Sequence, residues 1–77
     1  MFITKFSVNI YSEIISLLRK YGGTARDEEI YEALKKMFDM SYSEFQRKLM
    51  VLEIKGYISV STRKDGGKII NLLKKAR

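Results

Sequence analysis

The stretch Ser41–Ile58, SYSEFQRKLMVLEIKGYI, decides the fold, because it carries signals for the start, the buried face and the end of one helix. Ser41 and Glu44 have the spacing of a capping box, in which the hydroxyl accepts from one free backbone amide and the carboxylate from another. Gly56 indicates the end of the helix, since glycine enters the left-handed region without strain. The pattern predicts a helix over residues 42–55.

This helix has two different faces. Phe45, Leu49 and Leu52 recur at helical spacing on one stripe and should face the core. At about 100° per residue, the other positions point away from that stripe or lie at its rim. The outward positions are Ser43, Arg47, Met50, Val51 and Ile54, with Tyr42 and Gln46 toward the rim.

The chain before this helix predicts two more helices. Apolar residues at spacings of three and four indicate a helix over residues 7–21, with Ser7 as its cap and a glycine pair after it. Residues 27–38 have the same period, and carboxylates fill their first turn. Residues 1–6 alternate in a way that suits a short strand or an extended arm.

The chain after Gly56 reads as a β-hairpin. Residues 57–72 contain two alternating segments around Asp65 and Gly66, a strong hairpin signal in which the next glycine allows a bulge. Residues 73–77 form a basic tail. With 77 residues, the chain has room for one domain, residues 1–77. The predicted fold class is α+β, three helices followed by a two-stranded hairpin.

This order of elements resembles the winged helix-turn-helix superfamily over nearly the whole chain. The resemblance is most specific where the third helix passes into the hairpin, at Phe45, Leu49, Leu52, Glu53, Gly56, Tyr57 and Ile58. Size and composition are similar to archaeal or archaeal-virus members. The resemblance implies a third helix in the major groove of DNA and a hairpin wing on the backbone. Winged helices also serve as protein-binding modules, so it does not choose between these functions.

The charge distribution favours DNA as the partner. Residues 59–77 hold six basic residues and one acidic residue, nearly all of the net charge of +6. Neutralised phosphates would release counterions and make binding depend on salt. The candidate residues are Arg63, Lys64 and Lys68 as a backbone clamp, Tyr42 as a phosphate contact, and Ser43, Gln46 and Arg47 as groove residues. The bases equally suit a solvated loop and tail that keep a small protein in solution.

Three apolar residues on the outward face leave the function open. Met50, Val51 and Ile54 could pack under the arm or tail, contact thymine methyl groups, or form a dimer or protein interface. The interface reading makes the chain an accessory subunit of a replication, transcription or membrane-remodelling complex. Phe2 and Phe6 could form a second such surface and mediate a homodimer.

Several classes of function have no supporting residues. The chain has no cysteine and no histidine, which removes thiol nucleophiles and the usual zinc ligands. It also has no glycine-rich phosphate loop. Asp27, Glu28 and Glu29 are adjacent, so they suit the positive end of a helix dipole better than a metal. We expect a cytoplasmic, nucleoid-associated protein with no catalytic residues, cofactor, metal, small-molecule substrate or membrane insertion.

Overall fold

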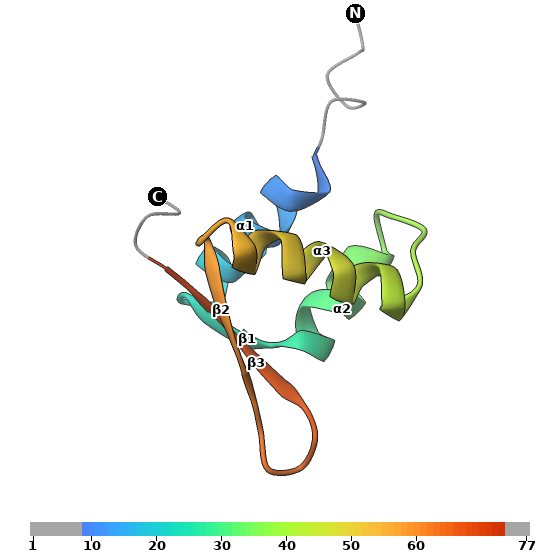
Figure 1. Ribbon diagram of the computed structural model, residues 1–77. Helices are drawn as coiled ribbons and strands as arrows, with labels where there is room; N and C mark the ends of the chain where they lie inside the picture. The colour runs from blue at the N-terminus through green and yellow to red at the C-terminus, as the bar shows by residue number, and fades with distance from the viewer. Residues whose placement is uncertain (1–8, 74–77) are drawn as a thin grey trace, which may run out of the picture.

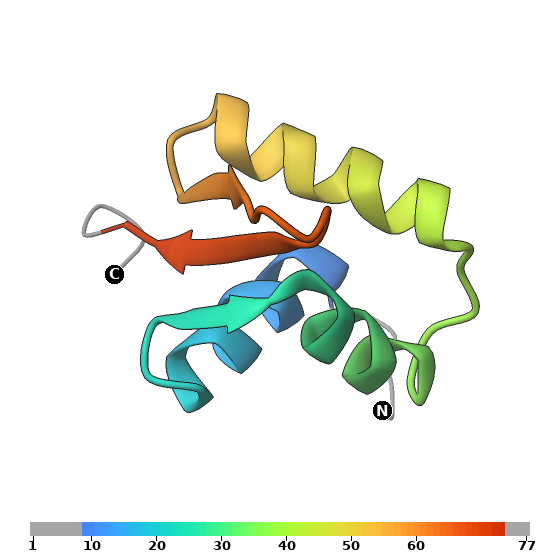
Figure 2. The same cartoon turned by 90° about the horizontal axis from the view of Figure 1, so that it is seen from below.

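The computed structural model describes residues 9–73, which form three helices and one three-stranded antiparallel sheet (Figure 1). In chain order the elements are α1 (Ile10–Lys20), β1 (Thr24–Arg26), α2 (Asp27–Lys35), α3 (Tyr42–Ile54), β2 (Ile58–Thr62) and β3 (Lys68–Leu72). The predicted α+β class is confirmed. In Figure 2, α3 runs along one side of the molecule, and α1 and α2 lie on the other.

Helix α3 follows its local signals closely. The Ser41 hydroxyl accepts from the Glu44 amide at 3.1 Å, and the Glu44 carboxylate accepts from the Ser41 amide at 2.9 Å. At the other end, Gly56 has a φ of 85°, and the Tyr57 amide donates to the Leu52 carbonyl at 3.0 Å. The capping box and the glycine stop are therefore confirmed, and the helix ends within one residue of the prediction.

The first two helices are shorter than predicted. Helix α1 begins at Ile10, not at residue 7, because extended Asn9 caps it with a side-chain oxygen that accepts from the Tyr11 amide at 2.7 Å. The predicted cap Ser7 and the arm, residues 1–6, lie outside the described residues. Helix α2 ends at Lys35, not at residue 38. In its last turn the Leu34 carbonyl accepts from two amides, those of Met37 and Phe38, so the regular helical pattern of one amide per carbonyl stops there.

The sheet has one strand more than predicted. Residues 24–26 pair antiparallel with β3, so that β3 lies between β1 and β2. Ala25 lies opposite Ile70 in this ladder, and both side chains are buried. The two-stranded hairpin was therefore incomplete: its return strand is the centre of the sheet.

The core lies between the three helices and one face of the sheet. Phe45, Leu49 and Leu52 are 0%, 2% and 3% exposed, which confirms the predicted inward stripe. The buried apolar residues of the described chain are Ile14, Leu17, Leu18, Ala25, Ile30, Leu34, Phe45, Leu49, Leu52, Ile58 and Ile70. Because three of them come from α3, the core fixes which side of that helix meets solvent.

The capping box gives a test of the fold. We expect Ser41→Ala to lower the free energy of unfolding by about 1 kcal/mol, because the Glu44 amide loses its acceptor. Ser43→Ala, two residues later on the exposed side, should change it by less than about 0.5 kcal/mol. Urea denaturation followed by circular dichroism measures both values. Equal losses in the two variants would contradict the capping role.

Candidate functional site

One stripe of α3 faces solvent along its whole length. Ser43, Arg47, Met50 and Ile54 are all exposed, Met50 at 57% and Ile54 at 78%. The first two are polar and the last two apolar, so the stripe changes character halfway along the helix. Val51, expected on the same face, is half-buried and turned toward a hollow beside α1.

A buried carboxylate connects α2 to the side of α3. Asp27, the first residue of α2, is 3% exposed. One carboxylate oxygen accepts from the Glu28 amide at 2.8 Å. The other accepts from the Tyr42 hydroxyl and, at 3.4 Å, from the Gln46 amide nitrogen. Asp27 therefore does more than place charge at a helix start: it joins two helices.

Tyr42 has a different role from the predicted phosphate contact. Its hydroxyl has one hydrogen, which it donates to Asp27. Its ring also packs in an aromatic cluster, 5.3 Å from the Tyr31 ring and 6.1 Å from the Phe45 ring, centroid to centroid. The hydrogen bond to Asp27, followed by burial, raises the pKa of Tyr42 from 10.0 to about 12. A phosphate could accept from the Tyr42 hydroxyl only if the hydrogen bond to Asp27 were broken, so the predicted phosphate contact stays a prediction.

Gln46 and Lys68, both predicted to contact DNA, lie together in the same network. The Lys68 ammonium at the start of β3 donates to the Gln46 side-chain oxygen at 2.9 Å. Because the amide nitrogen of Gln46 faces Asp27, both ends of this side chain are occupied within the protein. Both residues are half-buried. They hold the loop end of the hairpin, where Lys68 pairs with Thr62, against α3 and are not freely displayed side chains.

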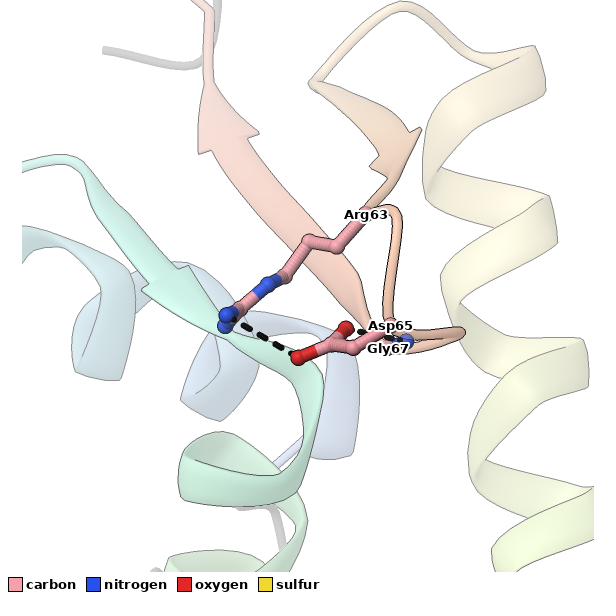
Figure 3. A network of polar contacts seen from close by, with 3 residues as sticks. All are labelled: Arg63, Asp65 and Gly67. Carbon is pink, nitrogen blue, oxygen red and sulfur yellow. Dashed lines mark hydrogen bonds and ion pairs between the residues drawn. The ribbon is translucent and has the colours of Figure 1, made fainter.

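The hairpin tip carries the other predicted clamp residues, Arg63 and Lys64. Figure 3 shows Arg63 with its neighbours Asp65 and Gly67. The Arg63 guanidinium pairs with the Asp65 carboxylate at 3.1 Å, and the Gly67 amide donates to the same carboxylate at 3.0 Å. That amide, more than the arginine, lowers the pKa of Asp65. Lys64 is exposed, and within residues 9–73 it has no hydrogen bond or ion pair.

The turn at this tip also differs from the prediction. Lys64 and Asp65 are its central residues, because the Gly66 amide donates to the Arg63 carbonyl at 3.0 Å. Gly66, with a φ of 96°, takes the bulge position expected of Gly67. The loop is thus a turn followed by a bulge, a common hairpin connection. It places Lys64 at the extreme end of the hairpin.

The described residues hold only part of the basic excess. Residues 9–73 contain 11 basic and nine acidic residues, and the other +4 of the net charge comes from Lys5, Lys74, Lys75 and Arg77. These four bases and the apolar pair Phe2 and Phe6 lie outside the described residues. Among residues 9–73, Arg47 on α3 and Arg63 and Lys64 at the hairpin tip are the predicted DNA-binding bases that lie outside the network of Lys68 and Gln46.

Comparison with known proteins does not assign the chain to a family. No protein-family model matches the chain, and a search of curated proteins finds no significant match. Among the described helices, none is long and apolar enough to cross a membrane.

The bond between Tyr42 and Asp27 gives the second test. We expect Tyr42→Phe to lower the free energy of unfolding by about 1–3 kcal/mol, because a buried carboxylate loses a donor. Tyr21→Phe is the matched control: Tyr21 is 45% exposed and Tyr42 44%, but the Tyr21 side chain has no hydrogen bond in the described structure. Denaturation in urea compares the two. If Tyr21→Phe lowers the free energy of unfolding as much as Tyr42→Phe does, the hydrogen bond between Tyr42 and Asp27 does not stabilise the fold.

The same variants have a pH readout. Because the pKa of Tyr42 is higher in the folded state, the protonated hydroxyl contributes stability that is fully present below pH 10.0. This contribution is lost as the pH rises toward about 12. The stability difference between wild type and Tyr42→Phe should therefore shrink across that range, as measured by unfolding at a series of alkaline pH values. A constant difference would contradict the assignment.

Proposed function

We propose that this chain is a non-enzymatic winged-helix protein that binds double-stranded DNA, as a transcriptional regulator or as a nucleoid- or replication-associated factor of the cytoplasm. The observation that carries the proposal is the hydrogen bond between Lys68 and Gln46. It holds the loop end of the hairpin beside the first half of α3. The polar half of α3 and the basic hairpin are thus held together as one unit.

The polar half of α3 would enter the major groove. Ser43 and Arg47 are exposed one turn apart and can reach base edges, where an arginine commonly binds guanine. Tyr42 and Gln46 flank them and are held by Asp27. In this proposal Tyr42, Gln46 and Lys68 position α3 and the hairpin, and Ser43 and Arg47 contact DNA.

The hairpin tip would lie on the phosphate backbone. Lys64 is exposed at its end and offers a full positive charge. Arg63 retains donors for a phosphate, because a guanidinium has five N–H groups and the pair with Asp65 uses one nitrogen. Two phosphate contacts from the tip would position the protein without reading sequence.

The third test is duplex binding by fluorescence anisotropy over a salt series. We expect Lys64→Gln to weaken binding to all duplexes and to reduce the slope of log K against log salt by about 0.9, the loss of one phosphate contact. The matched control is Lys36→Gln, which removes one exposed charge at the end of α2. Equal effects of the two variants would remove the hairpin from the mechanism, and no binding at low salt would reject the proposal.

A second candidate function is favoured by the exposure of Met50 and Ile54. Large apolar side chains next to each other on an exposed helix commonly mark a protein interface. In this proposal the apolar half of α3, with Val51 at its edge, joins two copies of the chain or binds a protein partner. It uses the opposite end of α3 from the DNA proposal, so both functions can hold.

The fourth test separates an interface from a core position. We expect Met50→Asp to abolish self-association in sedimentation velocity and to change the free energy of unfolding by less than about 0.5 kcal/mol. Met37→Asp is the control, because Met37 is 54% exposed, close to the 57% of Met50, and lies after α2. A wild type that stays monomeric at high concentration rejects the dimer, and unfolding of Met50→Asp rejects an exposed position.

A further inference from the structure

Most polar side chains at the start of α3 have partners within the protein. Ser41 and Glu44 each accept from the other's backbone amide in the capping box. The polar groups of Tyr42 and Gln46 are bonded in the network around Asp27. A base edge would therefore compete for each of these four side chains with a hydrogen bond that stabilises the fold.

Two polar side chains in the first half of α3 are exposed and without a bonded partner in the described structure, Ser43 and Arg47. Lys48 is half-buried, and its ammonium lies 5.5 Å from the centroid of the Tyr11 ring on α1. In helix-turn-helix proteins the N-terminal residues of the recognition helix contact the base edges, so Met50 lies beyond this part. The capacity of α3 to distinguish bases therefore rests on Ser43 and Arg47.

These two side chains differ in how well they distinguish bases. A guanidinium can donate two hydrogen bonds at once to O6 and N7 of guanine, and such a pair discriminates against a wrong base by about 5- to 150-fold. A serine hydroxyl both donates and accepts, so Ser43 suits several bases and discriminates little. The proposed contacts of the hairpin tip are to phosphates, which carry no sequence information.

We propose that each protomer recognises a single base pair, a G·C pair through Arg47, and otherwise binds double-stranded DNA of any sequence. This inference rests on the proposed DNA-binding function and names its substrate class. Operator-specific proteins bind their sites typically about 10³- to 10⁷-fold more tightly than other DNA, and one guanine contact falls below that range. The DNA-binding function is therefore that of a nucleoid- or replication-associated factor and not that of a regulator with one operator.

Other contacts would add little to this preference. A hairpin residue in the minor groove would distinguish A·T from G·C pairs only, because the pattern of donors and acceptors there is degenerate. A dimer would bring a second Arg47 and hence a second guanine, but the number of base pairs recognised by each protomer would stay the same. The claim is for this reason made per protomer.

The first part of the test selects duplexes from a randomised library on the wild-type protein and sequences them. Sedimentation velocity gives the number of protomers on a selected duplex. We expect one informative base pair per protomer, with guanine on one strand. Two or more informative base pairs per protomer would overturn the proposal, and so would a selected thymine whose enrichment is lost in Met50→Ala.

The second part assigns the guanine to Arg47 by competition anisotropy. A short duplex of A·T pairs with one central G·C pair should bind about 5- to 150-fold more tightly than the same duplex of A·T pairs alone. Replacing that guanine by 7-deazaguanine, which lacks the N7 acceptor, should remove most of the preference. Arg47→Met should bind both duplexes equally, whereas Lys64→Gln should weaken both and keep their ratio. An unchanged ratio in Arg47→Met would overturn the assignment.

The two proposals fail in different ways. Absence of binding to every duplex at low salt rejects DNA binding itself. Binding with a preference above about 10³-fold per protomer supports DNA binding and rejects only the sequence-tolerant class.

Discussion

The buried carboxylate of Asp27 is the constraint on which the candidate surface depends. A carboxylate at 3% exposure is costly unless donors surround it, and here the Glu28 amide, Tyr42 and Gln46 supply them. No buried side-chain nitrogen or oxygen lacks a partner among the described residues. Since two of the donors belong to α3, rotating that helix would leave a buried charge without them. The outward face of α3 is thus held by electrostatics on one side and by its apolar stripe on the other.

Because of this constraint, some polar residues of the candidate surface are bonded within the protein, and others face solvent. Tyr42, Gln46 and Lys68 are chemically suited to nucleic acid, but their polar groups are used to join α2, α3 and β3. What remains on the outside of α3 is polar in its first half, whereas its second half exposes the apolar pair Met50 and Ile54 beside Glu53. A helix with this division can present one end to a charged partner and the other to an apolar one. The hairpin supports the polar end of α3, because Lys68 at the loop end of the hairpin donates to Gln46.

Local signals predicted α3 well and predicted long-range pairs poorly. The capping box, the Phe45, Leu49 and Leu52 stripe and the glycine stop all act within a few residues, and each was confirmed. Strand β1 could not be recognised, because three residues have too little pattern and their stabilising partner, β3, lies more than 40 residues later. The hydrogen bonds of Asp27 could not be predicted for the same reason. Its donors on α3, Tyr42 and Gln46, are 15 and 19 residues away in the sequence, and no periodicity links them to Asp27. The inward stripe predicted the exposure of Ser43, Arg47, Met50 and Ile54 correctly, but Val51 is half-buried. The hydrogen bonds of the rim residues Tyr42 and Gln46 could not be predicted.

The two ends of α3 are held by different means, and this bears on how two partners could share one helix. At its start, a side-chain network and the capping box fix the helix to α2 and the hairpin. At its end, the backbone turn at Gly56 and the burial of Leu52 and Ile58 fix it to β2. Between α1 and this second end lie two small hollows that share Tyr11, Leu52 and Tyr57 in their walls. The display of Ser43 and Arg47 therefore depends on the contacts at the start of α3, and the display of Met50 and Ile54 on those at its end.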